Sequence, residues 1–238
     1  MPGYTRRQLK EDKFAKTAQG AAVWATDHRQ TVILTIGIAV IAIVAIVGLL
    51  AWWNRENEQA NIGLSAAMRT FETPLTPAGT PPPAGETGPF FSTIADRAKA
   101  AQKEFKAVAD TYSSVSAGKI ARYMSGIALE QANDKAGAEQ ELKKAADLSD
   151  KNVAALAKMA LASLYRGSNR VSEAVAIYKE LSEHPTVTVS KPQAQMALAE
   201  TYENTDPQQA TLIYQQLQKE NPQSPAAQMA AQKLAKSK

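Results

Sequence analysis

The chain has 238 residues, a formal net charge of +4 and no cysteine. The missing cysteine excludes disulfides, thiolate metal sites, a cysteine nucleophile and attachment of a lipid through a cysteine. The positive charge is concentrated in residues 1–53, and the remainder has nearly equal numbers of acidic and basic side chains, which argues against a nucleic-acid-binding surface. The two histidines, His28 and His184, lie on opposite sides of the membrane span predicted below, so they cannot form one site.

The longest apolar stretch runs from Thr31 to Trp53 and contains no charged residue. A helix that crosses a bilayer core of about 30 Å needs about 20 apolar residues, so this stretch predicts a transmembrane helix over residues 31–53. A buried core helix is the competing interpretation, but such helices seldom stay apolar on every face over this length. The stretch is also longer than the apolar part of a signal peptide, usually about 7–15 residues, and we expect it to be retained as an anchor.

Basic residues are unequally distributed around this stretch. Six Lys and Arg side chains precede it, whereas only Arg55 and Arg69 occur between it and Arg97. Because positively charged flanks stay in the cytoplasm, residues 1–30 are predicted to form a basic cytoplasmic tail, and residues from Asn54 onward to lie on the far side. The tail is interpreted as a frayed basic helix that leads into the membrane, with a docking or lipid-contacting segment as the alternative.

Two segments connect the predicted span to the rest of the chain. Residues 54–72 are polar and compatible with a helix, with Leu64, Met68 and Phe71 at helical spacing, and are predicted to continue the membrane helix as a stalk. Residues 73–91 contain half of the 12 prolines, whose fixed φ and missing amide donors prevent a helix. This segment is predicted to be an extended or disordered linker, with a ligand for proline-binding domains as the less favoured alternative.

From Ser92 to the C-terminus, alanine-rich segments with helical spacing alternate with short breaks rich in Asn, Asp, Ser, Gly or Pro. These breaks delimit eight helical segments. No stretch alternates apolar and polar residues for long enough to form a strand, and residues 186–189 are too few to stand alone. The sequence therefore predicts an all-α domain over residues 92–238.

This domain contains an internal repeat, because residues 159–181 and 196–217 align with one residue removed from the turn. Apolar positions of the predicted second helices recur at a spacing of 36 residues: Ala138, Ala174 and Ala210; Leu142, Tyr178 and Tyr214; Ala145, Leu181 and Leu217. A diverged copy occurs at Ala101, Phe105 and Val108. A small residue on each first helix (Gly126, Ala162, Ala199) allows its neighbour to approach closely. The pattern predicts antiparallel helix pairs that stack into a solenoid, because no pair buries its apolar face alone.

At these positions the sequence resembles the tetratricopeptide repeat family, in which small and aromatic residues recur on both helices of each pair. The period of 36 residues differs from the family's, and Arg122, Lys158 and Gln195 occupy the family's tryptophan position. The resemblance implies an α-solenoid of about three helix pairs followed by a capping helix. In that cap, residues 225–236, Met229 and Leu234 are expected to point inward.

Together with the predicted anchor, the layout resembles a narrower group of bacterial inner-membrane proteins. They have one span and a periplasmic tetratricopeptide-like domain, and are ancillary subunits of the Sec translocon. The resemblance covers the full length in layout but has no motif of its own. It implies association with the translocon and transfer of emerging exported chains to periplasmic chaperones.

Motifs for catalysis are absent from the sequence, which has no GxSxG, no phosphate-binding glycine loop, no HExxH and no carboxylate-rich metal loop. Acidic pairs such as Glu139/Glu141 and Glu200/Glu203 are interpreted as solvated residues on isolated helices rather than as acid–base groups. We therefore expect a protein that is not an enzyme and that needs no cofactor or metal.

Binding of a protein or peptide is the function that the repeat predicts. In the tetratricopeptide family the first helices line a concave groove, and the resemblance implies these groove residues here: Tyr123, Ile127, Met159, Ser163, Arg166, Met196, Glu200 and Glu203. Tyr123, Met159 and Met196 would give an adaptable apolar strip that accepts varied peptide segments, and packing in the core between helices is the alternative for these three. Arg166, flanked by Glu200 and Glu203, is alternatively an exposed ion-pair cluster.

Two functional hypotheses follow from this architecture. The first is a membrane-anchored periplasmic adaptor, associated with the translocon, that assists exported proteins. The second is an envelope scaffold that self-associates, or that positions division or outer-membrane machinery through its convex face.

Overall fold

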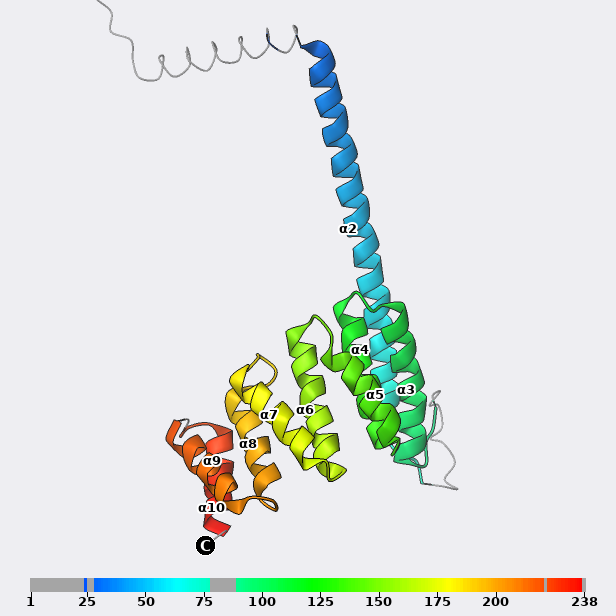
Figure 1. The fold of residues 1–238 in the computed structure, drawn as a ribbon. Coiled ribbons are helices and arrows are strands. Elements are labelled where there is room, and N and C mark those ends of the chain that lie inside the picture. Colours follow the sequence, from blue (N-terminus) through cyan, green and yellow to red (C-terminus); the bar gives the residue numbers. More distant parts are fainter. Residues whose placement is uncertain (1–23, 25–27, 78–88, 221, 237–238) are drawn as a thin grey trace, which may run out of the picture. The chain divides into compact units, whose positions relative to one another are not determined.

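The computed structural model describes residues 24, 28–77, 89–220 and 222–236. These residues are helical apart from short connections, and no strand occurs among them, which confirms the all-α prediction (Figure 1). The helices are α2 (Arg29–Glu72), α3 (Ile94–Thr111), α4 (Ser116–Gln131), α5 (Lys135–Ala146), α6 (Lys151–Gly167), α7 (Val171–Glu183), α8 (Lys191–Tyr202), α9 (Pro207–Glu220) and α10 (Pro225–Lys236). Nearly all of the predicted basic tail lies outside the described residues.

The eight predicted helical segments are α3 to α10, and the residues at the breaks explain where these helices start and stop. Asn133 and Asn169 have φ angles of 62° and 60°, a left-handed conformation that Asn tolerates and that ends a helix. Asp134, which follows Asn133, caps α5 by accepting from the backbone amide of Gly137. Asp150 caps α6 by accepting from the backbone amides of Asn152 and Val153. Asp206 caps the start of α9 in the same way.

From α3 to α10, each helix packs against the next helix in the sequence, and α4 also contacts α6, as α8 contacts α10. Contacts restricted to near neighbours are the mark of a solenoid. The repeated apolar residues of the second helices are buried in it as predicted, with Ala138, Leu142 and Ala174 at 0% exposure and Tyr178 at 1%. They form one continuous core with residues of α6, α8 and α9.

Gly126 illustrates why the first helices need small residues. A Cβ atom at this position would lie 2.7 Å from Cγ of Leu142, closer than carbon atoms can approach without displacement. The equivalent Ala162 and Ala199 are fully buried. The predicted close approach of the paired helices therefore occurs in the structure.

The compact repeat unit begins at Glu56 rather than at Ser92. The C-terminal part of α2 packs against α3, where the rings of Phe71 and Phe105 meet edge to face at 5.9 Å and the Thr70 hydroxyl donates to the Glu104 carboxylate. Gly63 lies directly against Val108. The segment predicted as a stalk is thus the first helix of a helix pair whose second helix is α3, which adds one pair to the three expected.

Backbone contacts hold together the two ends of the connection between α2 and α3. Leu75 and Phe91 form an isolated parallel bridge, with the Thr76 amide donating to the Phe91 carbonyl at 2.9 Å. Arg97 of α3 donates to the Thr73 carbonyl at 2.9 Å. The interior of the predicted proline-rich linker, residues 78–88, lies outside the described residues.

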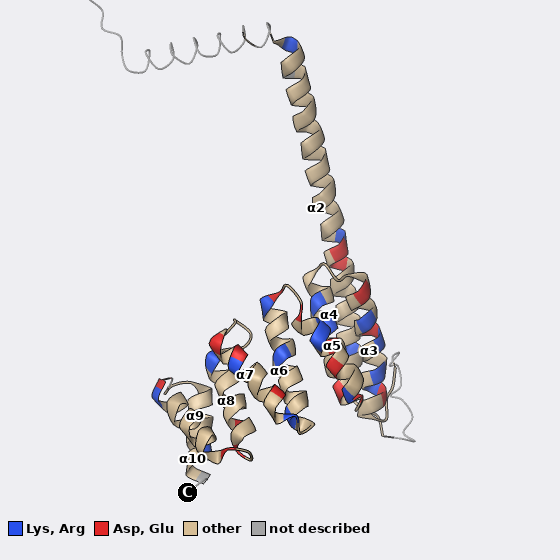
Figure 2. Ribbon diagram, viewed as in Figure 1, with Lys and Arg blue, Asp and Glu red and all other residues tan. Residues whose placement is uncertain are grey.

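The N-terminal part of α2 belongs to a separate unit, residues 1–55. Its apolar side chains are exposed, as in Ile33 at 59% and Leu34 at 64%, and no residue of its most apolar window is buried. No charged residue occurs between Arg29 and Arg55, and Figure 2 accordingly draws this part of α2 in tan. Among the described residues, α2 is the one helix long and apolar enough to cross a membrane, and its apolar N-terminal part, unlike its C-terminal part, is not buried in a core of the described structure.

Candidate functional site

A hollow lies between α6, α8 and α10 near the C-terminal end of the solenoid. Its volume is about 460 Å³. It is lined by Met159, Ser190, Pro192, Gln193, Met196, Ala197, Glu200, Ser224, Pro225, Ala226 and Met229. Three of the predicted groove residues, Met159, Met196 and Glu200, therefore share one concave surface. We call it the methionine hollow.

Met229 was expected to point inward, and the structure shows this prediction to be wrong. Helix α10 buries Ala227 and Ala230, at 3% and 0% exposure, whereas Met229 is 47% exposed and lines the methionine hollow. Ala227 and Ala230 fill the face of α10 that packs against the solenoid, and the longer Met229 side chain therefore lies at the wall of the methionine hollow. Met229 is the functional candidate that sequence reasoning missed, although its residue type matches that of Met159 and Met196.

Arg166 and the two nearby glutamates do not form one cluster. Arg166 donates to Glu200 at 3.1 Å, and the two side chains are 37% and 28% exposed. Glu203 instead accepts from the Tyr214 hydroxyl at 2.7 Å and pairs with Lys233 of α10 at 2.9 Å. Glu200 therefore faces the hollow, whereas Glu203 joins α8, α9 and α10.

The hydrogen bonds of Glu203 affect two pKa values. Burial alone would raise the pKa of Glu203, but the hydrogen bonds from Lys233 and Tyr214 lower it below its ordinary range. Burial, followed by the hydrogen bond to Glu203, raises the pKa of Tyr214. At neutral pH the pair therefore consists of an ionised carboxylate and a protonated phenol.

The remaining predicted groove residues lie outside the lining of the methionine hollow. Tyr123 and Ile127 of α4 are half-buried and pack against the main core, as the core-packing alternative predicted for Tyr123. That alternative also applies to the two methionines, because Met196 is 6% exposed and belongs to this core and Met159 packs against it. Ser163 of α6 is half-buried. Binding roles for Tyr123, Ile127 and Ser163 stay predictions.

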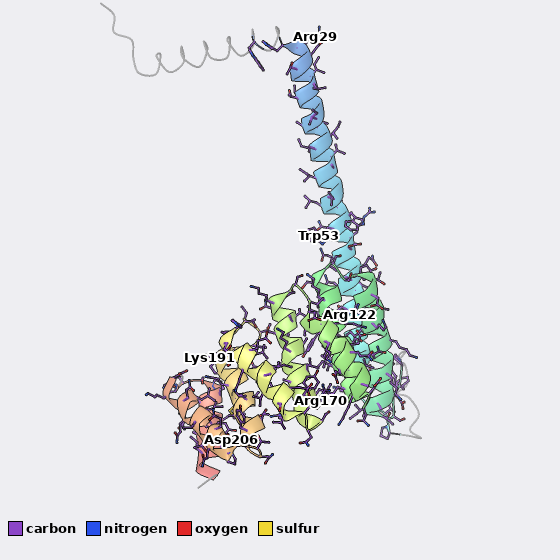
Figure 3. All side chains as sticks on the ribbon, in the orientation of Figure 1. Arg29, Trp53, Arg122, Arg170, Lys191 and Asp206 are labelled. Atoms are coloured by element: carbon purple, nitrogen blue, oxygen red, sulfur yellow. The ribbon has the colours of Figure 1, made fainter. Side chains whose placement is uncertain are left out.

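Glu141 corrects the prediction that acidic residues of α5 are isolated and solvated, because it is only 6% exposed. Its carboxylate accepts from Arg122 of α4 at 3.0 Å and from Lys144 at 2.8 Å, and Arg122 also reaches Asp110 of α3 at 2.6 Å. Figure 3 labels Arg122 in this part of the solenoid. The buried charge is stable there because two basic groups neutralise it.

A second ionic cluster surrounds Glu139, which joins α5 to α6 and to the start of α7. Glu139 accepts from Arg170 at 2.6 Å, from Lys143 at 2.7 Å and from the Tyr165 hydroxyl at 3.1 Å. The Arg170 guanidinium, labelled in Figure 3, lies 3.9 Å from the centre of the Tyr165 ring, a cation–π contact. Hydrogen bonds from Arg170 and then Lys143 lower the pKa of Glu139 to about 2.

These carboxylates are held ionised by basic partners, so they are poorly suited to donate protons near neutral pH. Within the described ranges, no group of three His, Cys, Asp or Glu side chains could hold a metal ion. The lining of the methionine hollow itself consists of apolar and neutral polar side chains and one carboxylate.

The fold and the hollow define the chain as an α-solenoid of stacked helix pairs with a concave, mostly apolar surface. The family model described as tetratricopeptide repeat-like domain matches residues 24–186, about two thirds of the chain. The protein therefore belongs to this tetratricopeptide repeat-like family. The matched range includes α2, in agreement with its packing against α3. No curated protein and no solved structure matches the chain.

Proposed function

We propose that the protein is a membrane-anchored adaptor of the bacterial inner membrane, without enzymatic activity. Its N-terminus lies in the cytoplasm, and its repeat unit binds protein partners in the periplasm. The observation on which the proposal depends is the methionine hollow, a concave apolar surface on a repeat fold that generally binds proteins.

The proposal of an anchor is supported by the exposed apolar surface of α2. A soluble protein rarely exposes a contiguous apolar patch of more than a few hundred Å², yet the side chains of residues 33–50 are exposed around the whole helix. Trp52 and Trp53 follow at its end and are also exposed, as expected of aromatic residues at a membrane interface. The basic residues that precede the span support the cytoplasmic placement of the N-terminus.

The orientation can be tested with one introduced cysteine, because the native chain has none. Val187 is 94% exposed in the loop before α8, so Val187→Cys should react freely with a maleimide. A membrane-impermeant maleimide added to intact spheroplasts should label this variant fully. Labelling that requires lysis would place the repeat unit in the cytoplasm and contradict the proposal.

The proposed partners are the Sec translocon, exported chains and periplasmic chaperones. Support comes from the resemblance in layout to ancillary translocon subunits, and from the hollow, whose methionines suit varied apolar segments. The competing function is a scaffold that self-associates or positions other envelope machinery.

Site-specific photocrosslinking separates these functions. A photoreactive residue at position 159 would lie in the methionine hollow, and one at position 212, where Leu212 is 59% exposed on α9, serves as the control. Adducts with translocon subunits or exported chains from position 159 but not 212 are expected. Adducts only with the protein itself, or with division and cell-wall proteins, would favour the scaffold.

A further inference from the structure

The methionine hollow has an unusual balance of charge. Among its lining residues Glu200 is the one charged side chain, and there is no Lys, Arg or His. The neutral polar groups are Ser190, Gln193 and Ser224, and the remaining lining consists of Met, Pro and Ala. The hollow therefore combines an apolar floor with a single negative charge.

We propose that this hollow is a subsite for a linear peptide segment in which a large apolar side chain stands beside a Lys or Arg. The apolar side chain packs against Met159, Met196 and Met229, and the basic side chain lies next to the Glu200 carboxylate. This inference rests on the proposed function as a protein-binding adaptor and specifies the chemistry of the bound segment.

The size of the hollow fits such an occupant. A volume of about 460 Å³ lies within the range of about 300–1,000 Å³ that is common for ligand pockets. It has room for a large apolar side chain together with its flanking backbone. Unbranched thioether side chains adjust to apolar groups of different shape, so the subsite selects for size and apolarity rather than for one residue type.

The charge of Glu200 favours a basic neighbour over an acidic one. Glu200 accepts from Arg166 through Oε2, and Arg166 is not among the lining residues. The Glu200 side chain is 28% exposed, so a basic side chain of the peptide can approach it. An acidic side chain there would meet like charge beside an apolar surface, where screening by water is weaker.

The subsite belongs to the C-terminal end of this chain. All of its lining residues except Met159 follow residue 186, where the match to the family model ends. The last helix, α10, supplies Pro225, Ala226 and Met229. Peptide selection by this surface is thus a property of α8 and α10 and not of the repeat pattern alone.

Fluorescence polarisation with the full chain in phospholipid nanodiscs tests the proposal. The probe is the labelled peptide GSLKFLSG, compared with GSLEFLSG, which reverses the charge, and with GSSKSSSG, which lacks the apolar side chains. We expect GSLKFLSG to bind at least tenfold more tightly than either comparison peptide. Equal affinity for all three, or no binding, would overturn the proposal.

Matched variants connect the binding to the hollow. Met229→Glu should weaken binding of GSLKFLSG at least tenfold, Met229→Leu should preserve it, and Leu212→Glu on the outer face of α9 should leave it unchanged. Both Met229 and Leu212 are exposed, so folding should tolerate these changes, which circular dichroism checks. Glu200→Gln should reduce the preference for the Lys peptide over the Glu peptide. Binding that is insensitive to Met229→Glu contradicts the assignment.

Two further outcomes separate this inference from the proposed function. If sedimentation shows a dimer that Met229→Glu converts to a monomer, the occupant is a second copy of the chain and the peptide proposal is overturned. If the peptides bind as expected but position 159 gives no crosslinks to exported or translocon proteins in cells, the subsite is supported and the proposed partners are wrong.

Discussion

The helix pairs α4–α5 and α8–α9 share the same repeat positions but differ in the side chain that one of these positions carries. Arg122 and Gln195 occupy the same position on the first helix of their pairs. Arg122 reaches the buried carboxylate of Glu141 on the second helix. Gln195 is 7% exposed, and its Oε1 has no hydrogen-bond partner among the described residues. In α4–α5 this position forms an ion pair with a buried carboxylate. In α8–α9 it buries an amide oxygen that has no hydrogen-bond partner among the described residues.

The comparison teaches that the fold and the surface depend on different residues. Small and large apolar residues at the repeated positions determine how two helices approach each other, and they are buried in both pairs. The other positions determine whether the gap between helices is filled by ions, as around Glu141, or left open and apolar, as in the methionine hollow. Changes at the repeated apolar positions should therefore destabilise every pair, whereas changes at the position of Arg122 and Gln195 should change the stability in opposite directions in the two pairs.

The largest change in unfolding free energy is expected at a repeated apolar position. Leu142→Ala removes a fully buried side chain that fills the space beside Gly126, and such truncations cost about 2–5 kcal/mol of unfolding free energy. Urea denaturation followed by circular dichroism measures the loss. Leu212→Ala, at a position 59% exposed, should change stability by less than about 0.5 kcal/mol; similar losses for both variants would contradict the assigned core.

Arg122→Met should cost about 3 kcal/mol, because it leaves the Glu141 carboxylate, 6% exposed, with Lys144 as its remaining basic partner. The double variant Arg122→Met/Glu141→Leu removes both charges and should recover most of the loss, since an apolar pair of similar volume often replaces a buried ion pair without cost. Chemical denaturation of both variants gives the comparison. A double variant no more stable than the single one would show that the ion pair itself stabilises this helix pair.

The same type of change should have the opposite sign in the other pair. Gln195→Leu removes the buried Oε1 that has no described partner and should stabilise the protein by about 1 kcal/mol. Thermal unfolding monitored in parallel with Arg122→Met provides the measurement. Destabilisation by Gln195→Leu would indicate that the amide oxygen is hydrogen-bonded in solution.

The smallest effect is expected from the partly exposed cluster around Glu139, where solvent screens the charges. The pKa of Glu139 is lowered from 4.5 to about 2 by hydrogen bonds from Arg170 and Lys143. A lowered pKa stabilises the folded state above pH 4.5, and this contribution is lost as the pH falls towards 2. Glu139→Gln should therefore be less stable than the native chain at pH 7, and the difference should shrink below pH 4.5 and disappear as the pH falls below 2. A constant difference across this range would exclude the ionic contribution.

The sequence was sufficient to predict the helical class, the eight segments α3 to α10 and their buried repeat positions. Asn and Asp residues at the breaks have strong local preferences for helix ends, as the φ angles of Asn133 and Asn169 show. The pairing of α2 with α3 could not be predicted with the same certainty. The proline-rich segment separates the two helices, so no regular spacing relates Phe71 to Phe105.

The site was less predictable than the fold because its residues depend on how each helix is rotated. Met159, Met196 and Glu200 were expected in a groove on the basis of family positions, and they do line one hollow. Met229 was assigned to the wrong face, since α10 has small residues on several sides and its pattern does not specify which of them is buried. The burial of Glu141 depends on Arg122, 19 residues earlier, a distance that no local rule covers.

The neighbour-only packing of the solenoid affects how binding would spread through the molecule. Helix α10 contacts α8 and α9, so local unfolding of α10 should leave the packing of α3 to α7 unchanged. A peptide bound in the methionine hollow would contact α6, α8 and α10 together and would stabilise the packing of α10. Occupancy should therefore slow amide hydrogen exchange at the end of the chain, and leave exchange in the distant helix α3 unchanged.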